Sequence, residues 1–495
     1  MRTPKKKRGP KTAAAVLSVR LNDRVTLEAD ADGRIKATFD GYSVQLGNFS
    51  AAAVKRAHSL RTGLPLASFA SARKPLDQEI ELLVRRLGQS GLVEYRLARG
   101  DKDMVVIEPQ QADYWPNLTK PGNADSVALS RFAYLRRRGN DVVLESPRAG
   151  ALFRICDPTI SSELVALSTP QKIGTLRRRD DFAGLELLAL LLDCQILFKV
   201  DPAVGNGLRG NEGDENLVLW DFHDLLFHVH STEGRQANPL GGRYPYVDVI
   251  APPPAVRPHW RGATIDLQEL ARAPAAASSP FTKLLRERHS ERDFDDQDPI
   301  RLAELAQLLD SVARVRSKWT SPLDFGDGGG DGPDIDYTTR PYPSAGSAYE
   351  LELYLAVANC EGLEPGFYHY DADRHAMVPL KVRAQELDAM FAGAEYAMDA
   401  LASPQILITI AARFNRINWK YSAIAYSLIL KNVGVLLQTL YLAATDMGLG
   451  GCAVGTNNID LFARMTGLPF HVEGPVGLFA LGRGQAEAPR ELPPA

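Results

Sequence analysis

The sequence predicts an α+β protein in which two small α+β units precede a larger C-terminal domain with a mixed central sheet and flanking helices. Two observations predict this class. The first two hundred residues contain two runs with the same order of strand and helix patterns. From Pro280 onward, long helical periods alternate with β-rich runs such as the one that begins at Glu350.

Length and composition narrow the function classes. A chain of 495 residues is long enough for about two to four domains. Its hydrophobic share of 45% and charged share of 24% are those of ordinary globular domains. The net charge of -3 gives no overall signature of nucleic-acid binding, so we expect no nucleic-acid partner.

The residues at both ends of the chain are expected to form tails. Residues 1–14 contain a basic run that is typical of a disordered tail, and residues 487–495 are expected to form a second tail. No stretch approaches the ~18 uncharged apolar residues of a membrane helix, and the N-terminus lacks the apolar core of a secretion signal. Four scattered cysteines form no CxxC pair, which argues against a disulfide framework or a structural zinc site. We expect a reduced, cytoplasmic protein without a membrane partner.

The repeated runs predict two units, at residues 15–115 and 116–215. In the first unit, strand patterns up to Phe39 lead into helices near 51–60 and 78–87 and a strand at 91–95. The second unit repeats this order, with strands near 141–144 and 151–155, helices near 161–167 and 182–192, and a strand at 195–200. Strands, short helices and a closing strand are the parts of a winged helix-turn-helix unit.

This fold often binds DNA, but the helical run FAGLELLALLLD carries acidic residues and no arginine, which suits a phosphate-lined groove poorly. A winged unit can instead offer a strand edge to an extended peptide. The alternative is that both units only pack on the catalytic domain.

Residues 216–279 predict a connecting helix and a linker rich in proline and alanine. The run from Trp220 to His230 contains His223, Asp224, His228 and His230. His223 and His228 are five positions apart, which puts them on one face of neither a helix nor a strand. We therefore expect a packed aromatic helix here and no metal site.

Four motifs in residues 280–486 carry candidate binding groups: RERHSER, RPYPSAG, GLGG and GLFALGRG, the last of which presents Arg483 as a phosphate candidate. Closely spaced arginines and a serine in RERHSER suit phosphate capture, although a charged surface turn would look the same. The turn RPYPSAG lets backbone amides approach a flat ring, and GLGG ends a long helix where a main-chain amide can face that ring. A phosphate-bearing flavin, FMN, requires these features.

The order of these motifs resembles the nitroreductase superfamily, and more closely its SagB/McbC-type branch of azoline dehydrogenases. The resemblance depends on RERHSERDF, RPYPSAGSAYELELYL, GFYHYD, the NWKYSAIAYS…GLGGCAVG run and VGLFALGRG. The upstream LWDFHDLLFHVHS and the two winged units are similar to the long forms of this family, as in cyanobactin oxidases. The resemblance implies bound FMN, a homodimer with the active site between subunits, and oxidation of thiazolines or oxazolines in ribosomally made peptides that a separate cyclodehydratase has cyclised.

The resemblance places the family's catalytic pair at Lys420 and Tyr421. It places the flavin contacts at Arg288, Ser290, Arg292, Pro343, Ser344, Gly346, Gly450, Gly451 and Arg483. Aromatising an azoline removes a hydride and a proton from neighbouring ring carbons, so the protein must supply a base. We expect Lys420 to be that base, with Tyr421 orienting it or accepting the proton. In the later part of the NWKYSAIAYS…GLGGCAVG run, the family often has an acidic residue after a lysine, whereas this chain has Lys431-Asn432. Two other functions remain open: a nitro- or quinone reductase that uses NAD(P)H, and a non-catalytic scaffold that binds a peptide.

Overall fold

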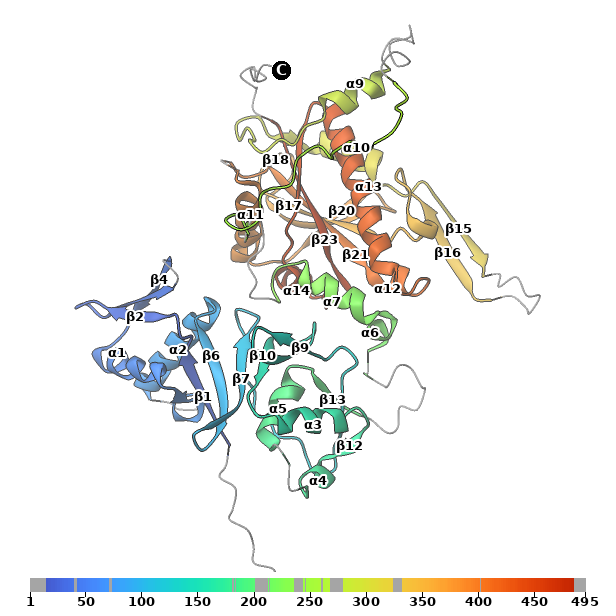
Figure 1. Cartoon of the computed structure of the whole chain (residues 1–495). Coiled ribbons are helices and arrows are strands. Elements are labelled where there is room, and N and C mark those ends of the chain that lie inside the picture. Colours follow the sequence, from blue (N-terminus) through green and yellow to red (C-terminus); the bar gives the residue numbers. More distant parts are fainter. Residues whose placement is uncertain are drawn as a thin grey trace, which may run out of the picture. The chain divides into compact units, whose positions relative to one another are not determined.

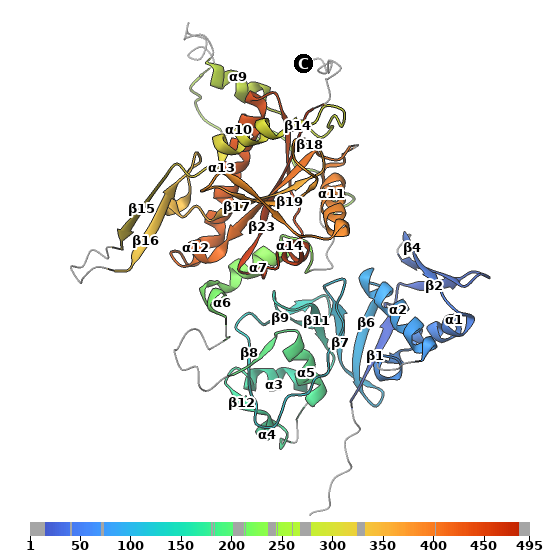
Figure 2. The same ribbon diagram turned by 180° about the vertical axis from the view of Figure 1, so that it is seen from behind.

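The computed structural model describes residues 15–39, 42–70, 74–179, 182, 184–200, 212, 214–235, 244, 246–259, 261–267, 279–323, 332–400 and 402–484. The chain divides into two compact units, Met1–Ala237 and Asn238–Ala495. Figures 1 and 2 show the elements of each unit from two sides. The predicted tails at 1–14 and 487–495, and most of the proline- and alanine-rich run after residue 267, lie outside the described residues.

The first unit is built around a seven-stranded antiparallel sheet with the order β5-β1-β6-β7-β11-β10-β9. Its strands are β1 (Ala15–Leu21), β5 (Leu64–Pro65), β6 (Val93–Arg99), β7 (Lys102–Pro109), β9 (Tyr134–Arg138), β10 (Asp141–Glu145) and β11 (Ala151–Ile155). Two three-stranded sheets accompany it: β2 (Thr26–Ala29), β3 (Arg34–Phe39) and β4 (Tyr42–Asn48), and β12 (Gln171–Lys172), β8 (Ser126–Leu129) and β13 (Leu197–Lys199).

The helices of the first unit follow the strands in the predicted order. They are α1 (Ala51–Ala57), α2 (Pro75–Gln89), α3 (Thr159–Ala166), α4 (Ile173–Leu176), α5 (Leu185–Asp193), α6 (Glu215–Leu219) and α7 (Phe222–His230), with 3-10 turns at His58–Arg61 and Leu66–Ser68. In α2, Ile80, Leu83, Val84 and Leu87 recur at helical spacing and are fully buried, which explains why this run folds as a helix against the sheet.

Two α+β units are present, as the sequence predicts. The order β5-β1-β6 in the first half has its counterpart in β12-β8-β13 in the second, and each half has three further strands followed by helices. The halves are not separate, however. Strand β11 pairs with β7 over Ala151–Ile155, and one buried core runs through both halves. This long-range pairing was not predicted from the sequence. It provides hydrogen-bond partners for the backbone N–H and C=O groups of β7, which would stay unpaired if β7 were an edge strand.

The connecting segment forms a packed aromatic helix, α7. Trp220 and His228 are fully buried and stack with their ring centroids 5.8 Å apart. His223 instead lies exposed and bonds Asp221, the residue that caps the helix. Within the described residues, no group of three or more histidine, cysteine or carboxylate side chains is placed to hold a metal ion.

The second unit contains a six-stranded sheet with the order β20-β19-β17-β21-β23-β22. Its strands are β17 (Leu351–Val357), β19 (Gly366–Asp371), β20 (Ala376–Leu380), β21 (Ile406–Arg413), β22 (Gly450–Val454) and β23 (Glu473–Gly482). All its neighbours pair antiparallel, whereas the sequence predicted a mixed sheet. Short connections join β17, β19 and β20, and such connections favour antiparallel neighbours. A parallel pair occurs apart from this sheet, between β14 (Ile300–Arg301) and β18 (Cys360–Glu361).

Helices cover both faces of this sheet (Figures 1 and 2). On one face α11 (Ala384–Met398) and α14 (Ile459–Thr466) pack over a core that includes Tyr354, Phe367 and Phe462. On the other face α13 (Ala425–Asp446) lies so close that Val433 fills the space where a Cβ of Gly477 would be. The remaining helices are α9 (Pro280–Glu287), α10 (Leu302–Val312) and α12 (Phe414–Asn418), and a hairpin is formed by β15 (Ser317–Pro322) and β16 (Asp334–Thr339).

Helix α13 is the longest described element. It ends as the sequence predicts, where Gly448 adopts a left-handed backbone conformation (φ 67°). Ala425, Ile429, Val433, Leu436 and Leu440 bury one face of it in the unit. By length and composition it is also apolar enough to cross a membrane, with Lys431 and Asp446 as its charged residues.

Candidate functional site

Lys420 and Tyr421 lie in the turn between α12 and α13, against the turn that contains Gly346. The Lys420 Nζ atom donates to the Gly346 carbonyl oxygen at 3.2 Å. Gly346 has a left-handed backbone conformation (φ 58°), and a Cβ atom there would lie 2.4 Å from Tyr421 Oη and 2.7 Å from Lys420 Nζ. The structure therefore brings Gly346 against the Lys420-Tyr421 pair, which is 74 positions away in the sequence and which we predict to share one site with it.

A buried polar network holds the neighbouring Ser344 turn. Asn432 of α13 donates to Glu350 Oε1 at 2.8 Å and to Ser344 Oγ at 3.2 Å, and its amide oxygen accepts from the Ala345 backbone N–H. Ser344 Oγ also donates to Glu350 Oε2 and accepts from the Tyr349 N–H. Burial raises the pKa of Glu350, which is fully buried, although the bond from Asn432 opposes the shift. The network fixes the turn that carries Gly346.

The β15–β16 hairpin borders the same site. The Lys420 Nζ atom lies 6.0 Å from the ring centroid of Tyr337 and 5.6 Å from that of Tyr421. Arg416 of α12 ties the hairpin to the site, because its guanidinium donates to the Asp336 carbonyl and, at 3.0 Å, to the Ala348 carbonyl. Nothing in the sequence motifs pointed to this hairpin.

A second group of predicted residues gathers around the other end of α13. Ser290 Oγ lies 2.9 Å from Tyr441 Oη, which accepts from the Ala453 N–H at 2.7 Å. The guanidinium of Arg288 lies 5.1 Å from the centre of the Tyr441 ring. Within the described part of the chain, no carboxylate pairs with the side chains of Arg288 or Arg292, so both cations are available to an anion.

The two glycines at the start of β22 are packed by protein side chains. A Cβ on Gly450 would lie 2.5 Å from Cγ of Glu291, and one on Gly451 would lie 2.3 Å from Cζ of Phe479. Glu291 is itself fixed, because its carboxylate accepts from the Arg292 and Asp293 backbone N–H groups. Packing alone thus accounts for the two small residues, and their contact with a flavin ring stays a prediction.

Arg483 lies in a different setting from the other predicted cations. Its guanidinium binds Glu304 at 2.9 Å and Asp298 at 3.1 Å. The hydrogen bond from the Arg301 backbone N–H, together with the bond from Arg483, lowers the pKa of Glu304. A phosphate would have to compete with two carboxylates for Arg483, so this geometry favours a structural role for it.

The predicted residues thus form two groups rather than one pocket within the chain. The base group, Ser344, Gly346, Lys420 and Tyr421, meets α13 at Asn432. The arginine group, Arg288, Ser290 and Arg292 with the two glycines, meets it at Tyr441. Nine positions at 1.5 Å rise separate these contacts by about 14 Å along the helix. Pro343 lies exposed beside the base group.

Three further residues of this region carry a signal that the sequence analysis did not use. Asn432, Glu350 and Glu291 are buried polar residues. Asn432 lies on the buried apolar face of α13, and Glu350 directly precedes the apolar strand β17. Such a residue in an apolar periodic run needs a hydrogen-bonding partner, which is a hint of a network. The partners themselves could not be read from one sequence.

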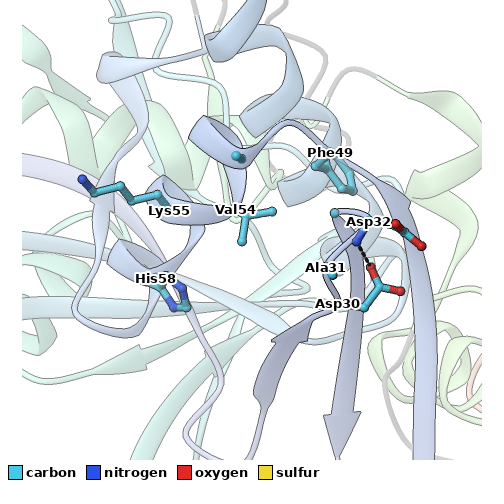
Figure 3. Close-up of a pocket in the computed structure, with 9 residues that line it drawn as sticks. Asp30, Ala31, Asp32, Phe49, Val54, Lys55 and His58 are labelled. Carbon is cyan, nitrogen blue, oxygen red and sulfur yellow. Dashed lines mark hydrogen bonds between the residues drawn. The ribbon is translucent and has the colours of Figure 1, made fainter.

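The first unit has a pocket of its own, with a volume of about 420 Å³, between the β2–β3 turn and α1. Figure 3 shows Asp30 and Asp32 on one side of it and Lys55 and His58 on the other. The Asp32 N–H donates to Asp30 Oδ1 at 3.0 Å, which fixes the turn. The pocket was not predicted from the sequence.

Known protein families match both units. Residues 285–483 match the model of the nitroreductase family, and residues 127–237 match that of the cyanobactin oxidase ThcOx. The second unit is thus similar to proteins of the nitroreductase superfamily. Together with the relatives that follow, these matches confirm the predicted resemblance to SagB/McbC-type members of that superfamily and the predicted α+β fold class.

Two relatives within the superfamily are similar to parts of the chain. A protein of Methanocaldococcus jannaschii named as a nitroreductase is 34% identical over 116 residues, which make up 23% of this chain and 58% of the relative. The microcin B17-processing protein McbC of Escherichia coli is 29% identical over 122 residues, 24% of this chain and 44% of the relative. The chain thus spans about half the length of the curated relatives it matches.

Among solved structures, the E. coli microcin synthetase McbBCD complex with truncated pro-MccB17 bound is similar at 20% identity and a TM-score of 0.39. The similar part covers 55% of this chain and 97% of that chain.

Proposed function

We propose that this protein is an FMN-dependent dehydrogenase that oxidises thiazoline or oxazoline rings to thiazoles or oxazoles in a ribosomally made peptide. The observation that carries the proposal is the crowding of Lys420 Nζ and Tyr421 Oη around Gly346. A conventional nitroreductase has no use for an amine and a phenol at this point, whereas ring aromatisation needs a base.

The residues present fit FMN. Arg288 and Arg292, which have no carboxylate partner in the described chain, and the Ser290 hydroxyl provide donors for a phosphate. Gly346 has no side chain of its own, and Lys420 Nζ and Tyr421 Oη occupy the space that a Cβ would take, so both polar atoms lie directly against the turn that we expect a flat ring to contact. When bound, FMN supplies the acceptor for the hydride that leaves the azoline ring.

The chain's own residues supply the rest of the reaction. The ring loses a hydride from one carbon and a proton from its neighbour, and the bond between those carbons becomes double. Lys420 accepts the proton, and the Gly346 carbonyl, which accepts from Nζ at 3.2 Å, aims the amine. Tyr421 Oη stands beside the amine and orients it or relays the proton. The buried bonds among Asn432, Glu350 and Ser344 keep the turn in place during the reaction.

We further propose a homodimer in which the arginine group of one copy completes the site of the base group of the other. The separation of about 14 Å along α13 supports this, because one chain does not gather both groups into one pocket. The outer face of α13, with Gly434, Val435 and Gln438 exposed, is available to a second copy.

Complementation tests the shared site. Lys420→Ala and Arg292→Ala each inactivate the homodimer, and co-refolding the two variants forms hybrids with one intact site. About a quarter of wild-type turnover should return, because half of randomly mixed dimers are hybrids and each has one working site of two. If mixing restores nothing although hybrids form, the site lies within one chain.

We propose that the first unit binds the peptide substrate. Strand β4 pairs with β3 on one side, and among the described strands its other edge is unpaired, which suits the addition of a peptide strand. A cyclodehydratase that makes the azoline is the expected partner, and we place the reaction in the cytoplasm. The McbC relative supports a role in peptide processing, since its name assigns it to the maturation of microcin B17.

Turnover of an azoline-containing peptide tests the proposed function directly. Lys420→Ala should keep bound flavin, read from its visible absorbance, and lose oxidation of the peptide, read as the loss of two hydrogens by mass spectrometry. The matched control, Lys381→Ala, removes an exposed lysine elsewhere in the second unit and should retain activity. Retained turnover in Lys420→Ala would remove this residue from the mechanism. Rapid bleaching of the flavin by NADPH would favour a nitro- or quinone reductase instead, and protein that cannot be reconstituted with FMN would favour a peptide-binding scaffold.

A further inference from the structure

The β15–β16 hairpin presents two different faces. Figures 1 and 2 both show it extending away from the six-stranded sheet. Its register pairs Lys318 with Thr338 and Trp319 with Tyr337. Because side chains alternate along a strand, these two pairs point to opposite faces. Lys318 and Thr338 line a charged cleft of about 490 Å³, and the aromatic pair occupies the other face.

The aromatic pair lies flat and open. The rings of Trp319 and Tyr337 stack with centroids 5.4 Å apart and an angle of 15° between their planes. Trp319 nevertheless keeps 43% of its surface exposed. The strands beneath are held by side-chain bonds between Ser317 and Thr339 and between Thr320 and Asp336. Trp319 is therefore a large aromatic side chain that is partly exposed to solvent on a strand pair held by hydrogen bonds, and such a side chain can bind a ligand.

The aromatic pair also lies close to Lys420, the proposed base. Tyr337 is close to both residues, since its ring stacks on Trp319 and its centroid is 6.0 Å from Lys420 Nζ. The guanidinium of Arg416 binds both the hairpin backbone at Asp336 and the Ala348 carbonyl beside the Gly346 turn. The hairpin is therefore fixed relative to the base group and does not simply project into solvent.

We propose that Trp319 and Tyr337 form an aromatic platform that holds a flat five-membered ring of the peptide substrate next to Lys420. This inference rests on the proposed function. Its occupant is a heterocycle of the peptide: the azoline that is to be oxidised or a neighbouring azole already formed. Stacking on an indole suits both, and it strengthens as the ring flattens and gains aromatic character, so the contact favours the transition state and the product over the starting azoline.

Three variants of Trp319 in the full-length, flavin-loaded protein test the platform. Trp319→Ala removes the surface, Trp319→Leu keeps apolar bulk without a flat ring, and Trp319→Phe keeps a flat ring. We expect kcat/KM for an azoline-containing peptide to fall about tenfold in the first two and to stay within about threefold of wild type in the third. Flavin content should not change, because Trp319 is not among the proposed cofactor contacts.

The control is Tyr396→Ala on α11, which removes an aromatic side chain that is 88% exposed. It should leave kcat/KM unchanged. Inhibition by the azole product provides a second readout: its inhibition constant should rise in Trp319→Ala and remain as in wild type in Trp319→Phe, because only the alanine variant loses the stacking surface.

The outcomes separate the platform from the function that it serves. If the wild-type protein oxidises no azoline peptide, the proposed function fails. If the wild type is active and Trp319→Ala matches it in kcat/KM and in product inhibition, the platform is refuted while the function stands. If Trp319→Ala instead changes the oligomeric state in size-exclusion chromatography without an effect on KM, the exposed face of Trp319 meets a second copy of the chain, which also refutes the platform.

Discussion

Gly346→Ala tests whether turnover depends on the positions of the Lys420 and Tyr421 side chains. Its effect on turnover can be distinguished from its effect on the stability of the fold. The added Cβ would lie 2.4 Å from Tyr421 Oη, whereas ordinary van der Waals contact begins near 3.4 Å, so the phenol oxygen must move by about 1 Å. Lys420 Nζ, at 2.7 Å, must move by about 0.7 Å. Displacements of about 1 Å in a positioned catalytic group lower turnover by about 100-fold.

The substitution also strains the backbone at residue 346. The resulting loss of fold stability has to be distinguished from the loss of turnover. A residue other than glycine at φ 58° destabilises the fold by about 1–2 kcal/mol. Gly467 provides the matched control, because it has a similar φ of 74° and a Cβ there would meet nothing within 4 Å. Both Gly346→Ala and Gly467→Ala should lower the melting temperature by a similar amount.

The assay measures oxidation of an azoline peptide by mass spectrometry, normalised to the flavin content of each variant. Only Gly346→Ala should lose about two orders of magnitude in kcat. If its kcat equals that of Gly467→Ala, the crowding of Lys420 and Tyr421 against this turn has no part in turnover, and the assignment of the base is wrong.

Two further predictions concern the buried network. Asn432→Leu leaves Glu350 Oε1 and the Ala345 N–H without their partner and should destabilise the protein by about 3 kcal/mol in denaturant unfolding, whereas Gln385→Leu, at an exposed position of α11, should change little. An equal effect of the two would contradict the network. Glu350→Gln tests pH dependence: because burial raises the pKa of Glu350 above its ordinary 4.5, the native state prefers the protonated acid, and wild-type stability falls as pH rises through the raised pKa. The melting temperature of Glu350→Gln relative to wild type should therefore increase with pH above about 4.5, and a difference that does not change with pH would show that Glu350 titrates normally.

The sequence predicted the elements better than the contacts between them. The repeated strand and helix order of the first unit, the course of α13 and its end at Gly448 follow from periodicity and glycine geometry, which are local properties. The pairing of β7 with β11 and the antiparallel central sheet depend on partners distant in the chain, which no local pattern specifies. The β15–β16 hairpin was missed for a different reason: its two strands follow each other in the chain, but they are short and rich in polar residues.

The candidate site shows the same division. The sequence indicated Lys420, Tyr421, Ser344 and Gly346, and the structure places them side by side. Gly450 and Gly451 were interpreted as small residues facing a flavin, but small residues are also needed where Glu291 and Phe479 pack, and a sequence does not distinguish the two causes. Arg483 was chosen for its charge, and the carboxylates of Glu304 and Asp298 that engage it lie far from it in the sequence.

The pairing of β7 with β11 has a consequence for how the protein can be divided. The part that matches the cyanobactin oxidase model begins at residue 127, and its strands β9 to β11 extend a sheet whose other strands come from before that point. A fragment that starts there would leave the β11 edge and the shared apolar core uncovered. The two halves of this unit should therefore unfold in one transition, and a peptide that stabilises one half by binding it should stabilise the other half as well.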